Sequence, residues 1–280
     1  MVLDIIAFGG LILAIILDSN PTLAGGALLV VGGGLCYLCT RELVALLFPE
    51  RLESAESFAT NYALLVIGFA YFFRRNDSDF IQLVLTIALM MASLMLAIAL
   101  IGCLSERRLR PFLQLVGITV ATTVLAGMFA HLVLLPTVVP NQTILIAVIV
   151  ASWVWWLLAQ RRASAHAQQG IDEPTTRLPS RALIAFAFVS TFLIGLIGAA
   201  LAVSALGGSN VLLKSGRIAW LVAVPGFVSV LLWEAVRPGL MRETEEPLII
   251  PFVRGRLLDR MIPLLFIATV LFYYFWSPRG

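Results

Sequence analysis

The stretch ALIAFAFVSTFLIGLIGAALAVSAL, Ala182 to Leu206, contains no charged side chain over 25 residues. An α-helix needs about 20 predominantly apolar residues to cross the hydrocarbon core of a bilayer. Similar runs recur along the chain, so that 60% of its residues are hydrophobic and only 12% are charged. Soluble globular domains have about 45–50% apolar and about 25% charged residues. The sequence therefore predicts an all-α polytopic membrane protein.

Apolar runs of near-spanning length occur nine times, and the third of them is short. They are Val2–Leu17, Thr22–Thr40, Ala59–Phe73, Phe80–Cys103, Phe112–Leu135, Gln142–Gln160, Ala182–Leu206, Ile218–Val236 and Met261–Trp276. We expect these runs to form about nine transmembrane helices within a single domain, residues 1–280. Small-residue clusters such as VGGGL and LIGLIGAA within them are typical of close helix packing.

The positions of the basic residues predict which side of the membrane each loop faces. Of the 19 Lys and Arg residues, 14 fall in or beside the loops after the second, fourth, sixth and eighth runs. Lys and Arg accumulate in cytoplasmic loops. We therefore expect a cytoplasmic N-terminus, an outside C-terminus and a short third run that does cross, because omitting it would move the basic LSERRLRP loop outside.

Several classes of function lack a sequence signal. The net charge is only +3, without the concentrated basic face of a nucleic-acid-binding protein. The two histidines are His131, near the predicted outer end of a span, and His166, in a predicted inner loop. Because they fall on opposite sides of the membrane, they argue against a bis-histidine haem site. Phosphate-loop, zinc-protease and nucleophile-elbow motifs are absent from the sequence. Cys36 and Cys39 have C-x-x-C spacing but fall toward the predicted inner side, so we expect reduced, structural thiols.

The order of spans and four polar segments resemble the UbiA-type intramembrane prenyltransferase superfamily. The segments are GGGLCYLCTREL with FPERLES, then IALIGCLSERRLRPFLQLVG, LLAQRRASAHAQQGIDEPTTRLP and EEPLIIPFVRGRLLDR. The resemblance implies an isoprenoid diphosphate substrate and Mg²⁺ held by two Asp-rich motifs, because paired carboxylates bind Mg²⁺ and the ion neutralises a leaving diphosphate. This chain lacks both motifs. It has Arg41 and Glu42 at the first position and Asp172 and Glu173 at the second.

The resemblance assigns one set of residues to each role. Glu42, Asp172 and Glu173 are the candidate catalytic residues, and Arg51, Arg108, Arg162 and Arg177 are the candidate contacts to the diphosphate. Guanidinium groups also bind phosphate without a metal, although the positive-inside rule explains the same arginines.

The resulting hypothesis is a diverged prenyltransferase-like protein that binds an isoprenoid or lipid phosphate at the cytoplasmic face and, if it is an enzyme, transfers a prenyl group. Mg²⁺ is the implied cofactor, a protein partner stays open, and the expected location is the inner or plasma membrane of a bacterium or archaeon. The alternative is a non-enzymatic subunit of a membrane complex or a transporter-like protein.

Overall fold

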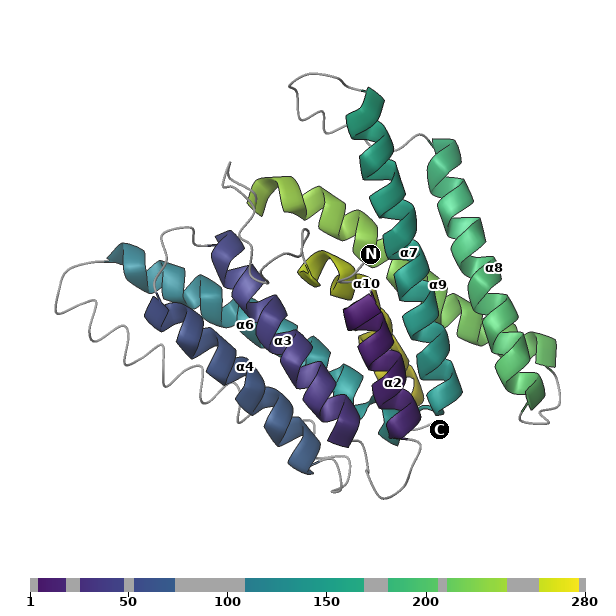
Figure 1. Cartoon of the computed structure of the whole chain (residues 1–280), viewed down its shortest axis with the longest axis horizontal. Coiled ribbons are helices and arrows are strands. Elements are labelled where there is room, and N and C mark those ends of the chain that lie inside the picture. The colour runs from purple at the N-terminus through teal and green to yellow at the C-terminus, as the bar shows by residue number, and fades with distance from the viewer. Residues whose placement is uncertain are drawn as a thin grey trace. The chain divides into compact units, whose positions relative to one another are not determined.

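The computed structural model describes residues 5–18, 26–47, 53–73, 109–168, 181–205, 211–240 and 257–276. Every regular element in these ranges is helical, which confirms the prediction of an all-α fold for them (Figure 1). The chain divides into two compact units, of which the first contains Met1–Val138 and Arg237–Leu258 and the second contains Val139–Val236 and Asp259–Gly280.

Five described helices are long and apolar enough to cross a membrane. These segments are Gly26–Leu47, Leu115–Thr137, Ile184–Ser204, Lys214–Val236 and Leu257–Trp276. They correspond to the second, fifth, seventh, eighth and ninth predicted spans. The first and sixth correspond to shorter apolar helices, the third to a helix outside this set, and the fourth lies outside the described residues. Nine crossings and the orientation of the termini stay predictions.

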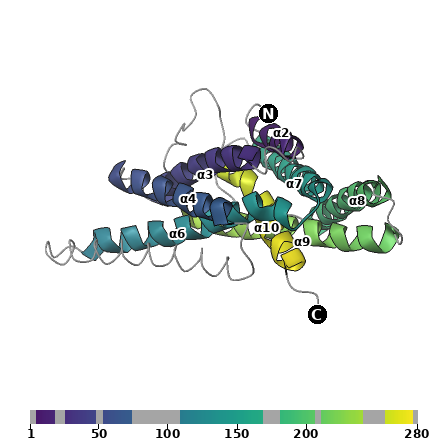
Figure 2. The ribbon, with the colours of Figure 1, turned by 90° about the horizontal axis from the view of Figure 1, so that it is seen from below.

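The first unit is built on helices that pack side by side (Figures 1 and 2). Its elements are the π-helix η1 (Ile5–Gly9), α2 (Gly10–Leu17), α3 (Gly26–Leu47), α4 (Glu53–Phe73), α6 (Leu109–Leu134) and the 3-10 helix η2 (Leu135–Thr137). Asp18 links the first two α-helices, because its carboxylate oxygens accept hydrogen bonds from the amides of Ala27 and Leu28, at 3.0 and 2.8 Å. Such a carboxylate satisfies amides that an α-helix leaves unpaired at its N-terminus.

Contacts along α3, α4 and α6 fix their relative directions. Val44, Ala59 and Ile118 form a buried cluster near the C-terminal end of α3 and the N-terminal end of α4. At the other end of α3, a Cβ added to Gly32 would lie 3.1 Å from Val133. Helix α6 therefore runs antiparallel to α3 and parallel to α4. The parallel direction is the one that the third and fifth spans of an alternating series would have.

The second unit contains α7 (Asn141–Gln168), α8 (Arg181–Ala205), most of α9 (Val211–Leu240) and most of α10 (Leu257–Trp276). Glycines of α8 allow close approach to α7 and α9, as the LIGLIGAA cluster predicted. A Cβ at Gly198 would lie 3.3 Å from Ile146 of α7, and one at Gly195 would lie 3.5 Å from the Cα of Ala219 on α9. Aromatic rings reinforce the α8–α9 contact, with the centroids of Phe192 and Trp220 5.4 Å apart.

Hydroxyl groups on α8 are paired within the helix itself. Ser190 and Thr191 donate to the carbonyl of Ala187 at 3.1 and 2.6 Å, and Ser204 donates to the carbonyl of Leu201 at 2.9 Å. Helix α10 differs because two charged residues near its start, Asp259 and Arg260, are buried. The two helices therefore differ in how their polar groups are satisfied.

Candidate functional site

Most of the sequence-predicted site falls outside the described side chains. Glu42 is the one member with a described side chain. Arg162 lies on α7, but its side chain is not described. The others lie outside the described residues, and they are Arg51, Arg108, Asp172, Glu173 and Arg177. Whether these residues come together with Glu42 stays a prediction.

Glu42 forms a bridge between α3 and the start of α10 within the first unit. Its side chain is buried, and its two carboxylate oxygens accept hydrogen bonds from the backbone amides of Leu257 and Leu258, at 2.8 and 2.6 Å. These are amides of the first turn of α10, where the helix leaves N–H groups unpaired and its dipole favours a negative charge. Glu42 therefore acts as an N-terminal cap contributed by a different helix.

This arrangement bears on the implied Mg²⁺ site. Mg²⁺ requires near-ideal octahedral coordination by oxygen, and it is usually bound through one or two carboxylates. Both oxygens of Glu42 are already oriented by the Leu257 and Leu258 amides. Within the described ranges, no group of three or more His, Cys, Asp or Glu side chains is placed to hold a metal ion. The two amides hold Glu42 at the start of α10, and its part in a Mg²⁺ site stays a prediction.

A second set of buried polar contacts lies in the second unit. Trp233 of α9 donates from Nε1 to the Oδ1 atom of Asp259 at 2.7 Å, and Asp259 is only 4% exposed. The guanidinium carbon of Arg260, whose residue is 6% exposed, lies 5.3 Å from the ring centroid of Trp155 on α7. Cation–π contact of this kind is strongest where the cation is removed from water. These contacts join α10 to α9 and α7.

Burying a charged side chain within a membrane protein costs free energy, so such a residue usually has a functional or structural role. Sequence reasoning counted Arg260 only as a topogenic charge and gave Asp259 no role. The available signal was the adjacent Asp-Arg pair that directly precedes the last apolar run, MIPLLFIATVLFYYFW. Chemically, the group of Asp259, Arg260, Trp155 and Trp233 provides buried donors and acceptors at one end of α10.

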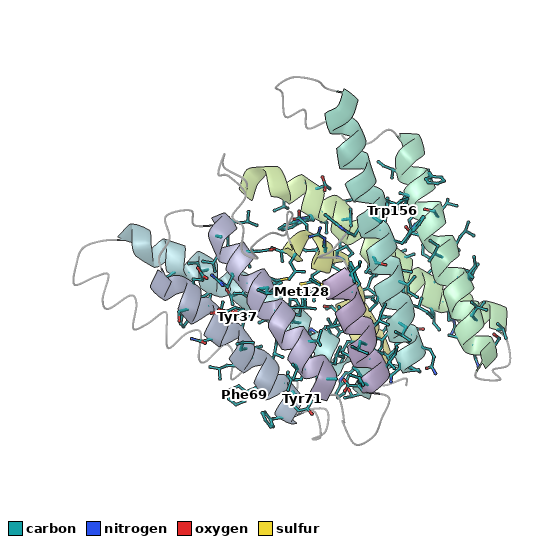
Figure 3. All side chains as sticks on the ribbon, in the orientation of Figure 1. Tyr37, Phe69, Tyr71, Met128 and Trp156 are labelled. Atoms are coloured by element: carbon teal, nitrogen blue, oxygen red, sulfur yellow. The ribbon has the colours of Figure 1, made fainter. Side chains whose placement is uncertain are left out.

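The loop predicted after the sixth span begins later in the chain than expected, because α7 is longer than the apolar run. The apolar part of α7 ends at Ala159, but the helix continues to Gln168 and includes Arg161 and Arg162. Ala, Arg and Gln have high helix propensity, which accounts for the continuation through RRASAHAQ. The arginine pair therefore lies on a helical extension beyond the apolar segment, and not in a loop. Trp156, labelled in Figure 3, lies near the end of that apolar part and is 48% exposed.

Cys36 and Cys39 are both buried and neither forms a disulfide. The Sγ atom of Cys36 lies 3.9 Å from the hydroxyl oxygen of Thr40, one helical turn away. A thiol in such a position behaves as a small apolar group with a weak donor. This environment agrees with the structural role expected for the CYLC segment.

Comparison with protein-family models and with curated proteins gives no match.

Proposed function

We propose that the chain is an integral membrane protein that binds an isoprenoid or lipid phosphate at its cytoplasmic face. The observation that carries the proposal is the helical extension of α7, which holds Arg161 and Arg162 beyond the apolar part of the helix. A basic pair at such a position lies close to the headgroup layer, where phosphate groups are concentrated. The membrane setting is supported by the five described helices that are long and apolar enough to span.

In this proposal the arginines bind the phosphate directly. The planar guanidinium group donates two parallel N–H···O bonds to a phosphate, so it orients the group as well as neutralising it. Arg162 on α7 and Arg177 in the segment that follows are the proposed donors, with Arg51 and Arg108 from the other cytoplasmic loops. Prenyl transfer, in which the diphosphate leaves the isoprenoid, is the reaction implied by the family resemblance. Asp172 and Glu173 are the remaining proposed ligands for Mg²⁺.

The test compares the effect on ligand affinity of replacing arginines on the predicted cytoplasmic side and on the predicted outer side of the membrane. Arg162→Gln and Arg177→Gln should each weaken binding of farnesyl diphosphate by about 1.5–3 kcal/mol, roughly ten- to hundredfold, because each removes a charge-assisted hydrogen bond. Arg217→Gln is the matched control, since Arg217 is exposed near the start of α9 and is predicted to lie outside. Isothermal titration of the detergent-purified protein, with and without Mg²⁺, measures the change.

If Arg162→Gln and Arg177→Gln both bound farnesyl diphosphate as tightly as the Arg217→Gln control, phosphate binding by Arg162 and Arg177 would be rejected. Asp172→Asn separates metal-dependent from metal-independent binding. If Asp172 holds Mg²⁺, the substitution should abolish any effect of the ion, since an amide lacks the anionic oxygen.

A non-enzymatic role is the second candidate, and the position of Glu42 favours it. A carboxylate expected to be catalytic accepts two backbone amides of another helix, which is a structural use of the side chain. Under this alternative the protein is a subunit of a membrane complex or a transporter-like protein. Purified protein that binds no isoprenoid diphosphate and shows no Mg²⁺-stimulated turnover would support it.

A further inference from the structure

One face of α3 changes from apolar to charged along its length. Val30, Gly34, Tyr37 and Arg41 are spaced by three or four residues, which places them on the same face of an α-helix. The face is open: Val30 is 74% exposed and Tyr37 is 37% exposed. No described atom outside the helix's own backbone would lie within 4 Å of a Cβ added at Gly34. An exposed face of this composition fits a partner that is apolar at one end and charged at the other.

The charged end of the face carries both signs. Nε of Arg41 donates to Oε1 of Glu56 on α4, and the guanidinium carbon lies 5.8 Å from the ring centroid of Tyr37. The side chains of Arg41 and Glu56 are 37% and 32% exposed, so neither is enclosed by protein. Among the described residues, Nε is the only nitrogen of the Arg41 guanidinium with an acceptor. The terminal nitrogens of Arg41 and the second oxygen of Glu56 thus provide a donor and an acceptor side by side.

A residue of α4 adjoins the apolar end of this face. A Cβ at Gly33 would lie 3.7 Å from Cδ2 of Leu64, and Leu64 itself is 38% exposed. Leu64 therefore continues the apolar surface beside Gly34. Seven residues separate Gly34 from Arg41, which corresponds to about 10 Å along the helix axis. Tyr37, labelled beside α3 and α4 in Figure 3, lies between Gly34 and Arg41 along α3.

From this face we propose that α3 and α4 bind one phospholipid with a phosphoethanolamine headgroup. The phosphate accepts hydrogen bonds from the terminal nitrogens of Arg41, and the primary ammonium donates to the carboxylate of Glu56. An acyl chain lies along Tyr37 and fills the open space at Gly34. The two charges of the protein complement the two charges of this headgroup, and no net charge is left over.

The choice of headgroup follows from the chemistry of its amine. A primary ammonium has three N–H donors for a carboxylate, whereas the trimethylated amine of phosphocholine has none. A phosphoglycerol headgroup offers the phosphate but places no cation beside Glu56. This site uses the outward surface of α3 and α4 and does not depend on the proposed binding of isoprenoid phosphate by other arginines.

The first experiment measures lipid retention by native mass spectrometry of protein purified from vesicles of equal parts phosphatidylethanolamine, phosphatidylcholine and phosphatidylglycerol. The wild type should retain phosphatidylethanolamine about five- to tenfold over either competitor, as expected from one or two charge-assisted hydrogen bonds in a partly exposed site. Glu56→Gln should remove the preference over phosphatidylcholine. Arg41→Gln should lower retention of all three lipids.

Gly34→Leu tests the apolar part of the site without changing either charge. Because the position is open, the new side chain should occupy the space of the acyl chain and lower retention about fivefold. Gly216→Leu is the matched control, since Gly216 near the start of α9 is also open and belongs to the second unit. The control should retain lipid like the wild type.

Three results would overturn the proposal. One is equal retention of the three lipids by the wild type, and another is an unchanged preference in Glu56→Gln together with unchanged retention in Gly34→Leu. The third is a wild-type dimer that dissociates in Arg41→Gln, which would assign the face to a second copy. A phosphatidylethanolamine with a photoactivatable acyl chain gives a test on the wild type alone. Its label should appear in residues 26–47, and labelling confined to other segments would reject the site.

Discussion

Replacement of Glu42 by alanine should cost more stability than any other single removal of a carboxylate described above. The substitution leaves the amides of Leu257 and Leu258 without the acceptors that now lie at 2.8 and 2.6 Å. A hydrogen bond to a charged group contributes about 1.5–3 kcal/mol, and removing one partner of a buried charged interaction costs about 3–5 kcal/mol. We therefore expect Glu42→Ala to lower the free energy of unfolding by about 3–5 kcal/mol. Glu42→Gln, which keeps one carbonyl oxygen but presents its NH₂ group to the other amide, should lower it by about 2 kcal/mol.

The measurement is an unfolding titration of the detergent-purified protein with SDS, followed by tryptophan fluorescence and far-ultraviolet circular dichroism. Glu56→Ala is the control, because its ion pair with Arg41 is partly exposed and such pairs contribute about 0.2–1 kcal/mol. If Glu42→Ala were no more destabilising than Glu56→Ala, the argument that the carboxylate caps α10 would be refuted.

Two further changes test other buried groups. Trp233→Phe removes the donor to the Asp259 carboxylate and should cost about 1.5–3 kcal/mol in the same titration, whereas a cost below about 0.5 kcal/mol would mean that another group or water replaces the bond. Joint replacement of Cys36 and Cys39 by alanine should leave the affinity for farnesyl diphosphate unchanged, because both thiols are buried and unbridged. A large loss of binding in that variant would return thiol chemistry to consideration.

Much of the helical architecture could be predicted because length and hydropathy are local properties. The run from Ala182 to Leu206 predicts α8 almost to the residue, and the LIGLIGAA segment predicts the glycine contacts of Gly195 and Gly198. Helix α7 extends past its apolar run because helix propensity, which a search for apolar runs ignores, favours RRASAHAQ.

The candidate site was less predictable because its contacts are distant in sequence. Glu42 was selected through a family resemblance, yet its amide partner at Leu257 lies 215 residues away. No local pattern around CTREL indicates that its glutamate caps the last helix. The pairing of Trp233 with Asp259 is hidden in the same way, since the two residues belong to different helices, 26 positions apart.

The different treatment of polar groups in α8 and α10 has a consequence for biogenesis. Because the hydroxyls of α8 are satisfied by its own carbonyls, this helix can leave the translocon and enter lipid without a partner. Helix α10 carries a buried aspartate and arginine at its start, and the contacts that stabilise them come from α7 and α9. Helix α10 thus requires two helices that precede it in the chain to be in place. We expect chains that lack α9 to expose the buried charges of α10 to membrane quality control.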